Sequence, residues 1–211
     1  MIGTREERVR KFGAEVRLDD PAFIHPSAEI YGKVRIGEEA SVWPFAVIRA
    51  EGQEIEIGPY ANIQDFVMLH IGIQHGTRIG AYCSITHHST IHAATIGDNC
   101  LVGINATVMD GCVIGDNCIV AGGSFLKEGT VIPDNSVVMG TPGRVTRRAN
   151  NWVANRLNAV IYHRNAVAYA QGQHRAWHGA GFEAFIKTEV ERLNAEFAAL
   201  GADLRAAAGG D

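Results

Sequence analysis

Three histidines, His70, His87 and His92, are the residues whose types and spacing best suit metal chemistry in this chain of 211 residues. All three fall in the stretch LHIGIQHGTRIGAYCSITHHSTIH, which begins at Leu69. Three neutral imidazoles with an open fourth position are the ligand set of many catalytic zinc sites. Whether these three can share one ion depends on the elements that carry them, and a repeat along the chain predicts those elements.

Aliphatic residues recur every six positions from Ile24 to Val138, with interruptions only near the histidines. The longest unbroken run is Ile96, Val102, Val108, Ile114, Val120, Leu126, Ile132 and Val138. A period of six is the signature of a parallel β-helix, in which three short strands make one triangular coil. Each aliphatic anchor points inward and stacks on its counterpart in the next coil. We therefore predict a mainly β protein with about seven coils.

The four cysteines follow the same repeat. Cys83, Cys100, Cys112 and Cys118 each come four residues after an anchor, which is the small inward position of the unit. The sequence contains no CxxC pair. We expect buried free thiols here, not a disulfide or a metal site.

The repeat also places the histidines. His70 and His92 each follow the third anchor of consecutive coils, Leu69 and Ile91, so they should stack close enough to bind one ion. His87 comes two residues after a second anchor and should point from another side of the triangle. Within one chain it is not expected to reach the same ion. A threefold arrangement of subunits would bring it to the other two histidines of a neighbour, which predicts a homotrimer with three intersubunit sites.

The most specific motif in the chain is NIQD followed by MLH, with two histidines five residues apart further on. It lies between SVWPFAVIRAE and the stretch TIGDNCLVGINATVMDGCVIGDNCIVAGG. Over about residues 20–148 the chain resembles the gamma-class carbonic anhydrase family, a branch of the hexapeptide-repeat proteins. The resemblance implies a left-handed parallel β-helix and a trimer with sites between subunits. It also implies a carbonate dehydratase, a lyase that hydrates carbon dioxide reversibly to bicarbonate through a zinc-bound hydroxide.

The resemblance also implies roles for individual residues. The three histidines become the metal ligands, of Zn²⁺ or, since imidazole suits them too, of Fe²⁺ or Co²⁺. Gln64 would orient the hydroxide or the substrate, and Asp65 and Asn62 correspond to further polar pocket positions. Arg49 corresponds to an arginine that pairs with carboxylates and links subunits. Turn formation at a coil corner is the alternative for Gln64 and Asp65, and an interface ion pair is the alternative for Arg49.

Three departures from the family pattern concern the same region. Arg49-Ala50-Glu51 replaces the usual Arg-Gly-Asp, so Glu51 keeps the charge on a longer side chain. His88 stands where a small residue is usual. The loop HIGIQHGTR lacks the acidic segment that carries a proton-shuttling glutamate in some members, and His75 is the local candidate for proton export.

Two other functions remain open. Many hexapeptide-repeat proteins are acyltransferases, and some resemble acyl-CoA thioesterases. Such an enzyme would use a single histidine base, His87 or His92, beside a CoA groove without metal. The third possibility is a metal-binding trimer with weak or no catalytic activity.

The rest of the chain predicts organisation and setting. The period ends after Pro142, and residues 149–172 and 182–200 show helical spacing, so we expect domains at 1–148, with a lead-in over 1–20, and 149–211. The first helix should cover the β-helix. A net charge of −4 and the lack of a long apolar run argue against nucleic-acid or membrane partners. The resemblance to carbonic anhydrases implies a small-molecule substrate. The N-terminus lacks a signal-peptide core, which favours a cytoplasmic protein.

Overall fold

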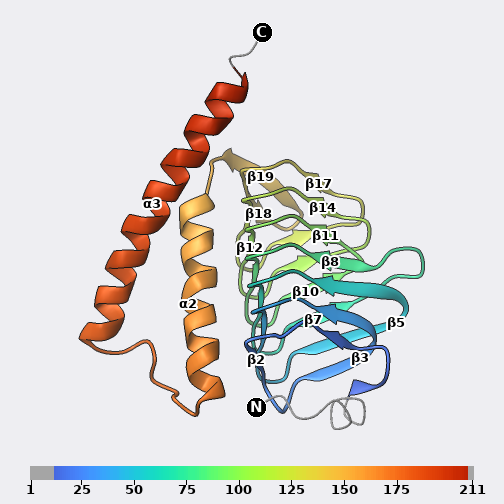
Figure 1. Cartoon of the computed structure of the whole chain (residues 1–211). Helices are drawn as coiled ribbons and strands as arrows, with labels where there is room; N and C mark the ends of the chain where they lie inside the picture. The colour runs from blue at the N-terminus through green and yellow to red at the C-terminus, as the bar shows by residue number, and fades with distance from the viewer. Residues whose placement is uncertain (1–11, 209–211) are drawn as a thin grey trace.

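The chain folds as a parallel β-helix followed by two helices, as predicted (Figure 1). The structure, a computed structural model, describes residues 12–208 and the side chains of residues 12–201. The ends of the two expected domains, residues 1–11 and 209–211, lie outside the described residues.

The β-helix has three faces. Face 1 consists of the first parts of β3 (Glu29–Ile36) and β5 (Val47–Ile57), then β7 (Met68–His70), β10 (Thr90–His92), β13 (Thr107–Val108) and β16 (Phe125–Leu126). Face 2 consists of β1 (Arg17–Leu18), the second parts of β3 and β5, β8 (Thr77–Ile79), β11 (Thr95–Ile96), β14 (Val113–Ile114) and β17 (Val131–Ile132). Face 3 consists of β2 (Phe23–Ile24), β4 (Ser41–Val42), β6 (Asn62–Ile63), β9 (Ser84–Ile85), β12 (Leu101–Val102), β15 (Ile119–Val120), β18 (Ser136–Gly140) and β19 (Gly143–Arg148).

The anchors of the repeat form the core. On face 1, Ile48, Leu69, Ile91, Val108 and Leu126 lie in register on successive parallel strands, and all five are fully buried. Burying one such side chain stabilises a fold by roughly 1.5–3 kcal/mol. Because every coil repeats this burial at the same position, the period of six is sufficient to specify the stacking.

One glycine lets two strands turn from face 1 to face 2. Gly32 has φ +79° at the bend of β3, where an added Cβ would lie 1.9 Å from the carbonyl oxygen of Ala50. A side chain at this position would therefore force β3 and β5 apart. β5 bends beside β3 at the same edge, and Arg49 and Glu51 lie at its bend.

Helix α2 (Trp152–Ala170) covers face 3, where it contacts β2, β4, β6 and β9. Trp43 of face 3 packs against Tyr162 and Tyr169 of α2, with ring centroids 5.7 and 5.1 Å apart. Helix α3 (Ala180–Ala208) packs on α2 and extends past its end (Figure 1), with Leu193 fully buried. Neither helix in the described part of the chain is long and apolar enough to cross a bilayer.

All four cysteines are free and buried, as the repeat predicted. Burial raises the pKa of the Cys112 thiol. The pKa of the Cys118 thiol is raised by its hydrogen bond with Cys100 and by burial. We expect no reaction of the native protein with a thiol-specific reagent and reaction of all four thiols after unfolding. Ellman titration with and without denaturant measures this, and fast labelling of the folded protein would contradict it.

Candidate metal centre

His70 and His92 lie side by side on adjacent coils at the edge between faces 1 and 2. They end β7 and β10, which pair in register at these two residues. His70 Nδ1 lies 3.0 Å from His92 Nε2. Two nitrogens bound at 2.0–2.1 Å to one tetrahedral ion lie roughly 3.3 Å apart. The observed separation therefore fits two ligands of a single metal ion.

A carboxylate contacts each of these rings. Asp110, on the coil after His92, lies with its Oδ2 2.7 Å from His92 Nδ1. On the other side, His70 Nε2 lies 3.1 Å from Glu51 Oε2. A carboxylate on one ring nitrogen fixes the orientation of a ligand histidine and leaves the other nitrogen for the ion. Asp110 was not among the predicted site residues, although the repeat places it one coil beyond His92 and two residues after the anchor Val108.

Glu51 also pairs with Arg49 of its own chain. Desolvation would raise the pKa of Glu51, but hydrogen bonds from its own backbone amide, Arg49 and His70 outweigh it and lower that pKa. The longer side chain in Arg-Ala-Glu thus lets the carboxylate contact both Arg49 and His70. Glu51 is therefore the carboxylate that pairs with Arg49 within one chain.

His87 lies at the opposite edge, between faces 3 and 1. Its Nδ1 is 2.9 Å from Asp65 Oδ2, and its Nε2 is 3.4 Å from the hydroxyl of Tyr162 on α2. Burial, and then the charge of Asp65, raises the pKa of Tyr162 to about 12, so this hydroxyl is a proton donor at neutral pH. Tyr162 was not among the predicted site residues.

The three histidines are therefore divided between two edges of one face. No group of three His, Cys, Asp or Glu side chains in residues 12–201 is placed to hold a metal ion. Imidazoles backed by carboxylates are suitable zinc ligands. The donor set fits the metal chemically, and one chain supplies it in two separate parts.

A chain of hydrogen-bonded polar side chains runs from this region to α2. Gln64 Nε2 donates to Asn62 Oδ1, Asn62 Nδ2 donates to Ser84 Oγ, and Ser84 Oγ donates to Asn158 Oδ1, at 2.8, 2.9 and 2.8 Å. Gln64 is 1% exposed, and its Oε1 has no hydrogen-bond partner. A buried acceptor without a partner is costly unless something outside the chain supplies a donor. Gln64 and Asp65 also form the coil turn that was the alternative for them, in which the Val67 backbone N–H donates to the Gln64 carbonyl at 3.2 Å.

Two further histidines near the site are exposed. His75 lies in the loop between β7 and β8, where it lines a cavity of about 440 Å³ together with Asp110 and Ile73. His88 stacks on Phe66 with ring centroids 4.8 Å apart. The structure thus places His75 beside the carboxylate that holds His92, and it places His88 among exposed rings.

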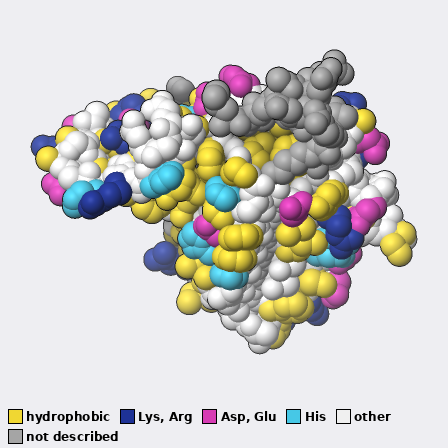
Figure 2. Space-filling view, turned by 90° about the horizontal axis from the view of Figure 1, so that it is seen from below, with side chains coloured by type: hydrophobic (Ala, Val, Ile, Leu, Met, Phe, Trp, Pro, Cys, Tyr) yellow, Lys and Arg dark blue, Asp and Glu magenta, His cyan; other side chains and the backbone are white. Residues whose placement is uncertain are grey.

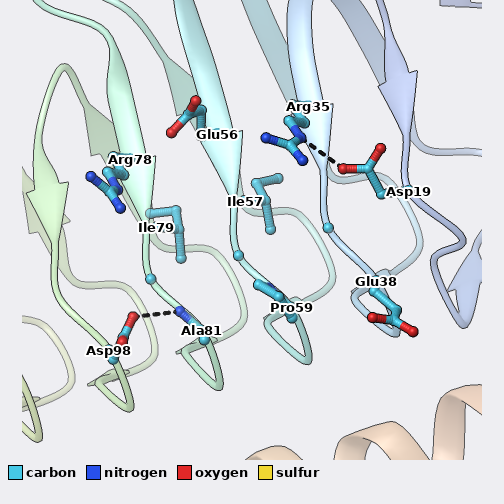
Figure 3. Close-up of a pocket in the computed structure, with 13 residues that line it drawn as sticks. Asp19, Arg35, Glu38, Glu56, Ile57, Pro59, Arg78, Ile79, Ala81 and Asp98 are labelled. Carbon is cyan, nitrogen blue, oxygen red and sulfur yellow. Dashed lines mark hydrogen bonds and ion pairs between the residues drawn. The ribbon is translucent and has the colours of Figure 1, made fainter.

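A second cavity, of about 490 Å³, lies on face 2, away from the histidines (Figure 3). Arg35, Glu56 and Arg78 project into it from three neighbouring strands, with the carboxylate between the two guanidinium groups. Asp19 pairs with Arg35 at 2.7 Å. Two arginines and four carboxylates line this cavity, and none of the three histidines does, so we do not include it in the metal centre.

Comparison with known proteins gives concordant matches. The family profile described as bacterial transferase hexapeptide (six repeats) matches residues 93–128. A "Probable carbonic anhydrase" of Methanocaldococcus jannaschii is 52% identical over 124 residues, which cover 59% of this chain and 78% of that protein. "Gamma carbonic anhydrase 1, mitochondrial" of Arabidopsis thaliana is 35% identical over 102 residues, 46% of this chain and only 37% of the plant protein. The crystal structure of a hexapeptide transferase family protein from Anaplasma phagocytophilum is 32% identical, with a TM-score of 0.65, covering 76% of this chain and 95% of that one.

Proposed function

Because this chain belongs to the gamma-class carbonic anhydrase family of hexapeptide-repeat proteins, we propose that it hydrates carbon dioxide reversibly to bicarbonate at metal sites between the subunits of a homotrimer. The observation that carries the proposal is the placement of the histidines. His70 and His92 lie at one edge of face 1, and His87 lies at the other. A threefold axis that runs parallel to the β-helix on the side of face 1 places the His70 and His92 edge of one copy beside the His87 edge of the next.

The surface of face 1 supports this arrangement. From β5 to β16 its outward row, in register on successive strands, is uncharged and half-buried: Val47, Met68, Thr90, Thr107 and Phe125. Only Glu29 of β3, at the N-terminal end of this row, is charged and exposed. Face 2 carries charged side chains in its outward row, and α2 covers face 3. Charged residues are depleted at the core of subunit interfaces, so face 1 is the face best suited to packing against copies of itself.

In the assembled site, His70 and His92 of one subunit and His87 of the next would hold Zn²⁺, with Fe²⁺ or Co²⁺ as other candidates. When bound, such an ion lowers the pKa of water at its open position towards 7 and so supplies the nucleophile for carbon dioxide. Asp110 and Asp65 keep the His92 and His87 rings in place.

The remaining pocket residues bind and orient. The free Oε1 of Gln64 accepts a hydrogen bond from the reacting water or from the bicarbonate hydroxyl, and the Asn62 side chain holds the Gln64 amide. Arg49, held by Glu51, lines the other edge and contributes a positive charge beside bicarbonate. We call the group around His70 and His92 and the group around His87 the two half-sites. These roles give each polar group in the two half-sites a use in carbon dioxide hydration.

Asp65 holds His87 Nδ1 and leaves His87 Nε2 for the ion, so with metal bound the Tyr162 hydroxyl would donate to bicarbonate instead of to His87. Tyr162→Phe should therefore lower kcat/KM for hydration by about 2- to 10-fold, the range for loss of one hydrogen bond of 0.5–1.5 kcal/mol. Metal content should not change, since the carboxylate of Asp65 still orients His87. Tyr169→Phe, on the same helix and packed on Trp43, is the matched control and should leave the rate as in the wild type. Equal losses in both variants would assign the effect to packing of α2.

The direct test is metal content together with bicarbonate formation on the purified protein. We expect about one ion per chain, because three interfaces serve three subunits. Chelation should abolish hydration, and returning the ion should restore it. No bound metal after purification without chelators would overturn the proposal.

Similarity to the Anaplasma hexapeptide transferase family protein favours a transferase as the second candidate, and acyl-CoA is the substrate class we would test for it. A metal-loaded protein without hydration activity would point to it or to a metal-binding trimer of weak activity. An assay of acyl-CoA thioester hydrolysis, with free CoA as the measured product, distinguishes an acyl-CoA enzyme from a metal-binding trimer of weak activity.

A further inference from the structure

Three aromatic rings stack on successive coils at the edge that carries His87. Phe45 and Phe66 have ring centroids 5.1 Å apart with planes 17° apart, and Phe66 and His88 have centroids 4.8 Å apart with planes 2° apart. We call Phe45, Phe66 and His88 the aromatic ladder. Phe45 is 55% exposed and Phe66 is 50% exposed. In the view from below, hydrophobic and histidine side chains gather along this flank of the β-helix, beside the helices (Figure 2).

The backbone at these three positions does not favour aromatic residues. Their φ angles are 60°, 60° and 59°, in the left-handed region that suits glycine and asparagine. The next two coils have Asn105 and Gly123 at the same turn position. The turn can therefore be made without rings, and rings at this position impose strain. A contact outside the turn is needed to explain them.

The third edge of the same β-helix, between faces 2 and 3, shows what such a ladder does. Tyr60 and Tyr82 have φ 56° and stack 4.8 Å apart with planes 2° apart. Helix α2 covers both rings, with the Arg156 guanidinium 3.6 Å above Tyr82 and His163 5.0 Å from Tyr60. In this chain, an aromatic ladder at left-handed positions is a surface on which another element packs.

The half-site at the other edge of face 1 has an exposed apolar residue of its own. Ile73 is 95% exposed in the loop between β7 and β8, residues 71–76, which begins directly after His70. Phe66 and His88 directly follow Asp65 and His87, the pair that forms the opposite half-site. When the two half-sites of neighbouring subunits meet, the loop and the aromatic ladder meet at the same interface.

We propose that the aromatic ladder is the docking surface for the β7–β8 loop of a second copy of this chain, with Ile73 of that copy packing on Phe66 and Phe45. This inference rests on the proposed function, because the shared metal site sets which edges meet. Packing Ile73 on the rings removes apolar surface on both copies from water. The ladder thereby holds His87 against the His70 and His92 pair of its neighbour.

The test replaces the rings with the residue that the turn favours. The Phe45→Asn/Phe66→Asn double variant should fold with unchanged or higher thermal stability of the dissociated chain, because Asn relieves the backbone strain. The trimer should dissociate at a protein concentration at least about 10-fold higher than the wild type, and dilute protein should lose its metal. Sedimentation velocity over a dilution series, with metal analysis at each step, measures both. Val131→Asn, at a 69% exposed position on face 2, is the matched control and should assemble like the wild type.

Ile73→Ser tests the other side of the contact. It should weaken assembly as well, and the triple variant should lose less than the sum of the two effects, because both changes remove one contact. Wild-type-like assembly and metal content in the double variant would overturn the inference while the proposed function stands. Trimeric, metal-loaded variants that lose only turnover would overturn it too and assign the rings to substrate. A wild-type chain that binds metal as a monomer would overturn both.

Discussion

A one-to-one mixture of His87→Ala and His92→Ala chains should regain carbon dioxide hydration that neither variant shows alone. Each variant lacks one of the three ligands in every site of its own trimer. In a mixed trimer, an interface that takes His70 and His92 from the His87→Ala chain and His87 from the His92→Ala chain has all three ligands. Random assembly completes about a quarter of the interfaces, so we expect about a quarter of the wild-type metal content and activity.

The control for this experiment is a mixture of His70→Ala and His92→Ala chains. His70 and His92 come from the same subunit, 3.0 Å apart, so no interface in that mixture has an intact pair. It should stay inactive. Subunits are exchanged by refolding together, and native mass spectrometry counts the mixed trimers. Mixed trimers of the first pair without recovered metal binding would exclude a site shared between subunits.

Asp110→Asn and Asp65→Asn should each weaken metal binding by about 10- to 100-fold while the fold is kept. Asp110 and Asp65 contact the Nδ1 atoms of His92 and His87, at 2.7 and 2.9 Å. The substitution removes the negative charge beside the imidazole. The new amide can also donate its NH₂ group to Nδ1, and the ring proton then sits on Nε2, the nitrogen that the metal needs. The expected effect is large because each metal site depends on one Asp110–His92 contact and one Asp65–His87 contact.

Competition with a metal-binding dye measures these affinities. Asp116→Asn is the matched control, because Asp116 accepts a hydrogen bond from the backbone of Asp98 in a coil turn and contacts none of the three histidines. An affinity loss in the Asp110 variant no greater than in this control would show that the carboxylate does not support the ligand. A loss in only one of the two variants would place only that histidine at the metal.

The amino-acid sequence alone determined the β-helix and the neighbours within it. Successive coils place equivalent positions one strand spacing apart, so the step from Leu69 to Ile91 was enough to predict that His70 and His92 lie side by side. The same reasoning predicted four buried thiols from their distance to an anchor. In a solenoid, contacts depend on the period, and the period can be read in the sequence.

Only the tertiary structure decided which residues surround the histidines. Tyr162 and Asn158 reach the site because α2 packs on face 3 through Trp43, a contact that no period in the sequence specifies. The turn of Glu51 towards Arg49 and His70 depends on side-chain rotamers, which residue spacing does not determine. Such positions follow from packing between distant parts of the chain, and the repeat describes only contacts between neighbouring coils.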